Sequence, residues 1–229
     1  MNYVMSDIHG AYDLFLKMLK KISFSEEDIL YIIGDIPSRG EQTFELLDFV
    51  MDKPNIVHIK GNHELFLQLY LENNVRMQRL YGLFGGASAI RDIEKMSEAQ
   101  RERYRDYLQK LPLYKEIKVN DKEYVLTHSG YMADEEPVMK PDKIVDIVAS
   151  IIKWGSSNEY EYLISNDIHY IPASIKFPFM IVGHYPTENL GSEGIYICNR
   201  YINMDNGVNI TKGRKLACLR LEDQKEYYV

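Results

Sequence analysis

Three short apolar segments near the start of the chain each end in polar residues of kinds that bind metal ions. The segments cover residues 3–5, 29–33 and 56–59, and each is followed by residues with helical character. Strands that alternate with helices form parallel sheets, and the loops at the carboxyl ends of such strands meet at one edge. The sequence therefore predicts an α/β fold whose functional site is assembled from the loops after these strands.

The rest of the chain continues the same domain with further helices and strands. Helices are expected at 11–21, 41–51 and 142–153. A mostly helical insertion is expected at about 64–110, and Ser97 to Gln100 form a capping box within it. Later strands are expected at 113–119, 123–127, 179–182, 194–198, 200–204, 215–221 and 225–229. A chain of 229 residues is long enough for one large domain and short for two, so we expect a single domain over 1–229.

Composition limits the classes of partner. The net charge of −7 and the isoelectric point near 5.4 predict no nucleic-acid partner and no anionic membrane surface. No run of about 18 apolar residues is present and the amino terminus lacks the pattern of a secretion signal, so a cytoplasmic location is expected. Cys198 and Cys218 are expected to be buried free thiols, with a disulfide between them as the alternative.

The polar residues after the strands have the chemistry of a two-metal site. Asp7 and His9 stand two positions apart, so on an extended backbone they point to the same face. A carboxylate oxygen with an imidazole nitrogen suits a divalent ion such as Mn²⁺, Fe²⁺ or Zn²⁺. Asp35, at the end of the next strand, can bridge two such ions. The residues that would complete the second ion are Asn62, His128 and His184.

The ordered series of clusters carries more weight than any one of them. A single Asp-x-His triplet arises by chance, and an isolated histidine is more often a structural residue than a ligand. Four of the six histidines fall within the series, namely His9, His63, His128 and His184. His58 and His169 lie outside it, and we interpret both as structural or surface residues.

The series also follows a known order of motifs. Its members are DIHG at 7–10, GDIPSRG at 34–40, GNHE at 61–64, HSG at 128–130 and GH at 183–184. This order resembles the metallophosphoesterases of the calcineurin-like superfamily, in particular bacterial members of the serine/threonine phosphoprotein phosphatase branch. Connecting segments that look like that branch include 85–88, 111–113, Trp154, 186–187 and 203–207. The resemblance covers nearly the whole chain and implies two packed mixed β-sheets flanked by helices.

The resemblance implies two divalent metal ions, Mn²⁺ first, with Fe or Zn as alternatives. One ion would be held by Asp7, His9 and Asp35. The other would be held by Asp35, Asn62, His128 and His184. A hydroxide that bridges the two ions would attack phosphorus directly and in line, without a covalent enzyme intermediate.

The resemblance also assigns roles to the residues around the phosphate. His63 would protonate the leaving oxygen as general acid, and Arg39 would bind the phosphate in bidentate fashion. Asn62 and His63 would contact the same phosphate. Asp205 would orient a site histidine, or would instead be a turn residue of the Asp-Asn-Gly sequence at 205–207.

Two positions depart from the family pattern. The second motif is usually GDxxDRG, and Ser38 here replaces the carboxylate that orients and charges the general-acid histidine. A hydroxyl can hydrogen-bond His63 but gives little stabilisation to its cationic form, so phenolic and phosphoanhydride leaving groups would suffer least. The arginine that often follows the tryptophan is also missing, and the nearest cations are Lys153 and Lys176.

These observations favour a metal-dependent phosphomonoesterase, first of all a serine/threonine protein phosphatase, acting on phosphoproteins or small phosphate esters. One alternative is a dinucleoside polyphosphate hydrolase, which the serine at position 38 favours but which lacks a clear base-stacking platform in the sequence. The other is a catalytically weakened metal-binding sensor of a phosphorylated ligand. The sequence does not specify the oligomeric state.

Overall fold

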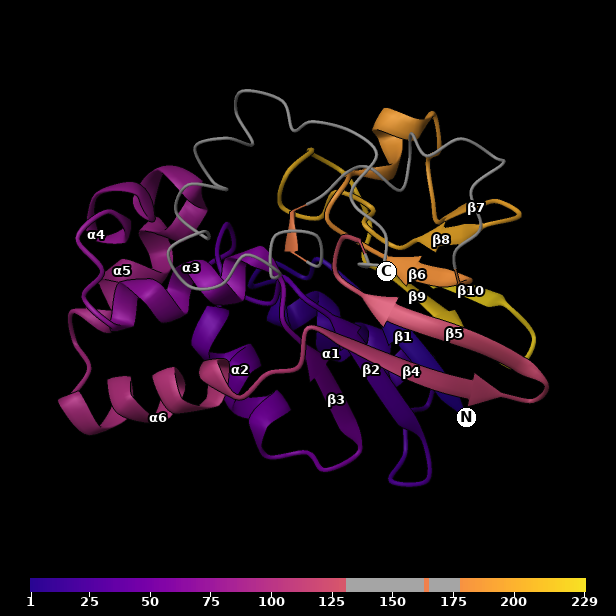
Figure 1. The fold of residues 1–229 in the computed structure, drawn as a ribbon, viewed down its shortest axis with the longest axis horizontal. Helices are drawn as coiled ribbons and strands as arrows, with labels where there is room; N and C mark the ends of the chain where they lie inside the picture. Colours follow the sequence, from indigo (N-terminus) through magenta and orange to yellow (C-terminus); the bar gives the residue numbers. More distant parts are fainter. Residues whose placement is uncertain (131–162, 165–177) are drawn as a thin grey trace.

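The protein folds around two five-stranded sheets, which the computed structural model describes for residues 1–130, 163–164 and 178–229 (Figure 1). Across the first sheet the strands are β10 (Lys225–Tyr228), β9 (Ala217–Arg220), β1 (Asn2–Met5), β2 (Ile29–Ile33) and β3 (Ile56–Ile59). Across the second they are β4 (Tyr114–Val119), β5 (Lys122–Thr127), β6 (Met180–Val182), β8 (Tyr201–Asn203) and β7 (Tyr196–Ile197).

Both sheets combine parallel and antiparallel pairs. In the first sheet β1, β2 and β3 are parallel, with Tyr3 opposite Leu30, whereas β9 and β10 are antiparallel. In the second, β5, β6 and β8 are parallel and the hairpin β4–β5 is antiparallel. The parallel strands bring the loops after β1, β2, β3, β5 and β6 to one edge, as the sequence predicts. The fold class of two mixed sheets flanked by helices is confirmed.

The helices follow the expected order. They are α1 (Tyr12–Lys21), α2 (Thr43–Met51), α3 (Asn62–Leu71), α4 (Met77–Leu80), the π-helical turn η1 (Gly82–Gly86), α5 (Ala87–Ile93), α6 (Glu98–Gln109) and the 3₁₀ turn η3 (Thr187–Leu190). The helical insertion is thus present, and Figure 1 shows α3 to α6 gathered beside the sheets, away from β7 and β10. Ser97 caps α6 as predicted, because its hydroxyl accepts from the Gln100 N–H at 3.3 Å.

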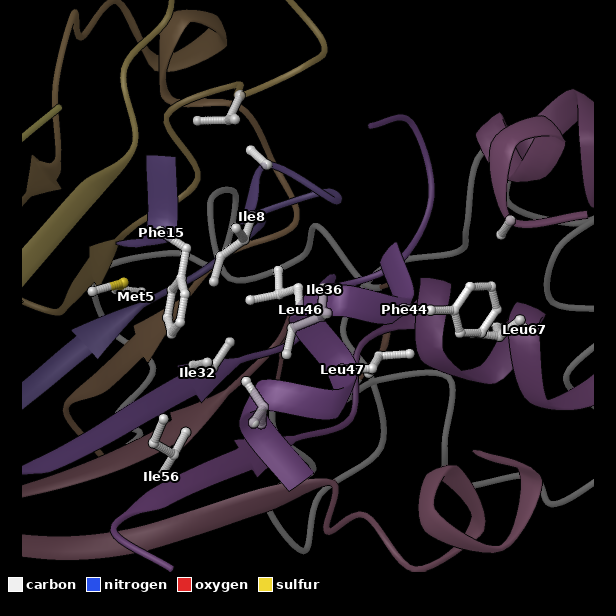
Figure 2. Packing of buried hydrophobic residues seen from close by; sticks show 14 of the residues in the cluster. Met5, Ile8, Phe15, Ile32, Ile36, Phe44, Leu46, Leu47, Ile56 and Leu67 are labelled. Carbon is white, nitrogen blue, oxygen red and sulfur yellow. The ribbon is translucent and has the colours of Figure 1, made fainter. Parts of the chain in front are cut away.

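The first sheet is buried on both faces. Met5 and Ile32 pack against the helices in the cluster of Figure 2, together with Phe15 of α1 and Leu46 of α2. Val4 and Ile33 point the opposite way, into the core between the sheets. Each fully buried aliphatic side chain of this kind contributes about 1.5–3 kcal/mol. Burial on both faces therefore gives a rigid platform for the loops at the strand ends.

Two further expectations concern single features. Cys198 is half-buried and Cys218 is buried, and both are free thiols as predicted. No helix in the described part of the chain is long and apolar enough to cross a membrane. The helix predicted at 142–153 lies outside the described residues.

Candidate metal centre

The predicted ligands come from loops of both sheets, each at the carboxyl end of a strand. Asp7 and His9 follow β1, Asp35 follows β2, Asn62 begins α3 after β3, His128 follows β5 and His184 follows β6. The carboxylates and three of the four histidines, including His63, are buried, and His184 is half-buried. The structure therefore brings together residues that lie up to 177 positions apart, as the hydrogen bond from His184 to Asp7 shows.

The backbone at the centre is strained. Asp7, His9, Asp35 and His184 have positive φ angles of 50°, 48°, 58° and 66°. Each such conformation in a non-glycine residue costs on the order of 1–3 kcal/mol and requires support from its surroundings. Cross-loop hydrogen bonds supply that support: the N–H of Asp7 donates to Gly34 O at 3.1 Å, and the N–H of His9 donates to Asp35 O at 2.9 Å.

Two groups of donor atoms share Asp35. One group is His9, Asp35 and His63, and the other is Asp35, His128 and His184, with all donor atoms of a group within 4.8 Å of one another. Oδ2 of Asp35 lies 3.8 Å from Nε2 of both His9 and His63. Oδ1 of Asp35 lies 3.3 Å from Nε2 of His128. A carboxylate with one oxygen turned to each group has the arrangement expected of a residue that contacts two ions.

The second group has the electronic character of a cation site. Nδ1–H of His128 donates to Ile33 O at 2.9 Å, so its Nε2 carries a lone pair. That nitrogen faces Asn62 Oδ1 at 2.9 Å, and Nδ1 of His184 lies 3.0 Å from the same oxygen. Nε2 of His128 and Oδ1 of Asn62 are therefore two acceptors that face each other with no hydrogen between them, and their lone pairs repel. A divalent cation could bind both lone pairs, so these residues fit a metal ion.

Burial makes the charged forms of the ligands costly in the metal-free protein. Burial raises the pKa of Asp7 and of Asp35, and neighbouring carboxylates, Asp205 beside Asp7 and Glu64 beside Asp35, add to the effect. Burial lowers the pKa of His9 to about 3 and that of His128 to about 4. Neutral imidazoles are the form that binds metals, and a cation would stabilise the ionised carboxylates.

Asp7 and His63 both lie at the centre, but only His63 falls within a donor group. The carboxylate of Asp7 accepts hydrogen bonds from the Ser6 hydroxyl and from the N–H of His184 at 3.1 Å, and it lies outside both donor groups. Nε2 of His63, the predicted general acid, lies within the first group instead. The ring of His63 meets that of His9 edge-on at 4.9 Å between centroids. The assignment of Asp7 as a ligand stays a prediction.

Ser38 does not contact the predicted general acid. Its hydroxyl is hydrogen-bonded to the hydroxyl of Tyr81 at 3.0 Å, and both side chains are fully buried. Nδ1 of His63 is buried and has no hydrogen-bond partner among the described residues. The hydrogen bond from position 38 to His63 that the sequence allowed is therefore absent, because Tyr81 from the helical insertion takes the hydroxyl.

Arg39 is exposed and follows Ser38 in the loop after β2. Its backbone N–H donates to Gly85 O at 2.7 Å, which ties it to the turn η1. The side chain is exposed, and in the described part of the chain its guanidinium has no hydrogen-bond or ion-pair partner. The positive charge acts on the centre, since Arg39 contributes to the lowered pKa of His9 after burial itself. An exposed guanidinium without a described partner is chemically suited to phosphate binding, so this role of Arg39 stays a prediction.

Of the two interpretations of Asp205, its hydrogen bonds agree with that of a turn residue. Its Oδ1 accepts from the N–H of Gly207 at 2.8 Å, as the aspartate of an Asp-Asn-Gly turn does. Its Oδ2 is buried and has no hydrogen-bond partner among residues 1–130, 163–164 and 178–229, so no bond to a site histidine is formed there. Burial raises the pKa of Asp205 to about 6. The residue acts on the centre through its charge, since it raises the pKa of Asp7.

Sequence reasoning missed Glu64, which is completely buried one turn into α3. Oε2 of Glu64 accepts from the N–H groups of Asp35 at 2.9 Å and of Gly61 at 2.7 Å, and Oε1 accepts from the N–H of Ile36 at 2.7 Å. Burial acts to raise its pKa, but hydrogen bonds from His58 and from the backbone outweigh burial and bring the pKa to about 2. The available signal was its place as the last residue of the GNHE motif at 61–64, a position that was given no role in the sequence analysis.

His58 was interpreted as a structural or surface residue, and the structure shows that it is buried. His169, Trp154, Lys153 and Lys176 fall outside the described residues, so the second phosphate clamp stays a prediction.

Comparisons with known proteins agree on one family. The calcineurin-like phosphoesterase family model matches residues 3–188. The asymmetrical bis(5'-nucleosyl)-tetraphosphatase PrpE of Bacillus subtilis is 25% identical over 219 residues, which cover 89% of this chain and 84% of that protein. Serine/threonine-protein phosphatase 1 of Salmonella typhimurium is 26% identical over 132 residues, which cover 57% of this chain and 59% of that protein.

A likeness to solved structures extends over the whole fold. The cold-active protein-tyrosine phosphatase of a Shewanella species superposes with a TM-score of 0.57 at 19% identity, covering 99% of this chain and 79% of that one. At this level of identity the likeness shows that the fold is shared.

Proposed function

Because the chain belongs to the calcineurin-like phosphoesterase family, we propose that it is a metal-dependent hydrolase of dinucleoside polyphosphates. The observation that carries the proposal is the environment of His63, whose Nδ1 has no described partner while Ser38 is hydrogen-bonded to Tyr81. The similarity to a bis(5'-nucleosyl)-tetraphosphatase over most of both chains supports the same substrate class.

Two divalent cations, when bound, would offset the charge of the phosphate and lower the pKa of a coordinated water. Mn²⁺ is the ion we expect first, with Fe or Zn as alternatives. The residues that would hold the ions are His9, Asp35, Asn62, His128 and His184, with Asp7 beside them. Asp35 would be shared by both ions. The exposed guanidinium of Arg39 would bind two phosphate oxygens, and the amide of Asn62 would contact the same group.

The ability of His63 to donate a proton determines which leaving groups are favourable. In anhydride hydrolysis the oxygen of water bonds to phosphorus, the P–O–P bridge breaks, and the leaving nucleotide departs as a stable phosphate anion. An alkyl ester must instead release an alkoxide, for which general-acid help is worth ~10²–10⁴-fold. His63 lacks a carboxylate partner to orient its ring or share its positive charge. A substrate that requires little protonation is therefore favoured.

The second candidate is the serine/threonine protein phosphatase activity expected from the motif order. The similarity to serine/threonine-protein phosphatase 1 over 57% of the chain supports it. Phosphoserine and phosphothreonine are alkyl esters, so this activity would depend more strongly on His63. The third possibility, a metal-binding sensor, predicts uptake of Mn²⁺ without turnover.

The test compares three substrates on metal-stripped protein reloaded with Mn²⁺: diadenosine tetraphosphate, p-nitrophenyl phosphate and a phosphothreonine peptide. We expect the highest kcat/KM for the dinucleotide and the lowest for the peptide. Asp35→Asn is the control, and it should abolish all three activities if they belong to this centre.

Each other outcome selects a different function. A higher kcat/KM for the peptide than for the dinucleotide would replace the proposal with the protein phosphatase. Uptake of Mn²⁺ with no turnover of any substrate would replace it with the sensor.

A further inference from the structure

A chain of hydrogen-bonded side chains leads from α6 to the candidate metal centre. The hydroxyl of Tyr107, on α6, lies 2.9 Å from Nδ1 of His58, on β3. Nε2 of the same imidazole lies 3.2 Å from Oε1 of Glu64, on α3. The side chains of His58 and Glu64 are 2% and 0% exposed, so water does not compete for the contact between them, and Tyr107 is half-buried.

Hydrogen bonds on both sides of the ring hold the imidazole of His58. Nε2 faces Oε1 of Glu64, which also accepts from the N–H of Ile36 at 2.7 Å, and Nδ1 faces the hydroxyl of Tyr107. These two contacts fix the orientation of the ring and direct its Nε2 atom at Glu64.

Glu64 in turn holds two loops of the centre, those after β2 and β3, through hydrogen bonds to their backbone. One of its oxygens accepts from the N–H groups of both Asp35, in the loop after β2, and Gly61, in the loop after β3. The carboxylate of Asp35 in turn accepts from the N–H of His63 at 3.0 Å. A single buried carboxylate therefore sets the separation between the shared aspartate and the first turn of α3.

We infer that His58 and Tyr107 are positioning residues of the metal centre, which act on its ligands through Glu64. The inference rests on the dinuclear site of the proposed function but not on the identity of its substrate. It gives α6, which contributes no candidate ligand among the described residues, an indirect influence on metal affinity through His58 and Glu64. Partners of this kind behind ligand-bearing groups typically change metal affinity or activity by ~10–100-fold when removed.

The test uses Tyr107→Phe, which removes one hydroxyl and keeps the ring. Its matched control is Tyr104→Phe on the same helix, where the buried Tyr104 donates its hydroxyl to Asp48 at 2.9 Å, away from the centre. Mn²⁺ affinity is measured by titration calorimetry on metal-stripped proteins, and unfolding midpoints are recorded in parallel. We expect Tyr107→Phe to weaken Mn²⁺ binding about tenfold, which is the low end of the ~10–100-fold range. Tyr104→Phe should leave Mn²⁺ binding unchanged.

A second variant, Glu64→Gln, keeps the shape of the side chain but replaces one acceptor oxygen by a donor. It should weaken Mn²⁺ binding by about 100-fold. The inference is overturned if Tyr107→Phe and Tyr104→Phe lower the unfolding midpoint alike and both bind Mn²⁺ as the wild type does. If the wild type itself takes up no Mn²⁺, the proposed function is overturned together with the inference.

Discussion

His128 and His63 belong to different donor groups around Asp35, and the chain holds these two imidazoles in different ways. His128 donates one ring nitrogen to Ile33 O at 2.9 Å, which directs the other toward Asn62 and Asp35. His63 has a buried ring nitrogen with no described partner, and only its backbone N–H bonds to Asp35. The comparison indicates that the chain keeps a precise geometry for metal binding and less support for proton donation to a leaving group.

The largest effect is expected from Asp35→Asn, because the carboxylate of Asp35 belongs to both donor groups, that of His63 and that of His128. The amide keeps one oxygen but loses the negative charge and offers a donor where a metal would bind. Activity should fall by more than the ~10–100-fold that follows loss of an outer partner, and Mn²⁺ stoichiometry should drop. Calorimetry and steady-state kinetics measure both, and Asp48→Asn on α2 is the surface control. Unchanged Mn²⁺ stoichiometry would contradict a shared ligand.

The paired variants His128→Asn and His63→Asn test the comparison itself. His128→Asn should reduce turnover of every phosphate substrate to a similar extent, because it removes a ligand. His63→Asn should reduce hydrolysis of alkyl phosphates by up to ~10²–10⁴-fold and that of anhydrides by much less. Ratios of kcat/KM across the three substrates provide the measurement. A uniform loss in both variants would mean that His63 serves as a ligand, as its place in the first donor group allows.

Ser38→Asp should reduce the difference between the two imidazoles. A carboxylate at this position would stabilise the cationic form of His63, so turnover of alkyl phosphates should rise more than that of aryl phosphates, by up to ~10²-fold, the low end of general-acid catalysis. Tyr81→Phe is the matched control, since it frees the Ser38 hydroxyl without adding charge. Equal changes for both substrate classes would eliminate the general-acid explanation.

The smallest effect is expected from a change of pH on Mn²⁺ affinity, and it should arise from protonation of the buried carboxylates at the centre. The pKa values of Asp7 and Asp35 are raised by burial and that of Asp205 to about 6, so the metal-free protein holds protons that Mn²⁺ must displace. Mn²⁺ affinity should therefore fall as pH decreases, by at most tenfold per unit for each proton released. The pKa of His128, lowered to about 4, excludes its protonation near pH 6. Calorimetry in buffers of different ionisation enthalpy counts the protons, and none released at pH 6 would contradict this.

Most of the scaffold of the site follows from local sequence patterns. Strands β2 and β3 begin and end at the predicted residues, and the capping box places the start of α6. The gathering of the candidate ligands was also predictable, since parallel strands leave their carboxyl ends at a common edge. Glu64 was not predicted, because nothing in an apolar helix shows that its one early carboxylate turns inward to three backbone N–H groups.

By itself, the sequence determined which residue types stand at which strand ends, because strand and helix periodicity depend on neighbours within one element. The tertiary structure alone decided the side-chain partners that tune the site. Ser38 meets Tyr81 across 43 positions, and His58 meets Tyr107 across 49. Such pairs depend on how α3, η1 and α6 pack beside the first sheet, and many side-chain arrangements satisfy the same apolar pattern. The candidate metal ligands could thus be proposed from the order of the motifs, whereas the groups that contact them became visible only in the fold.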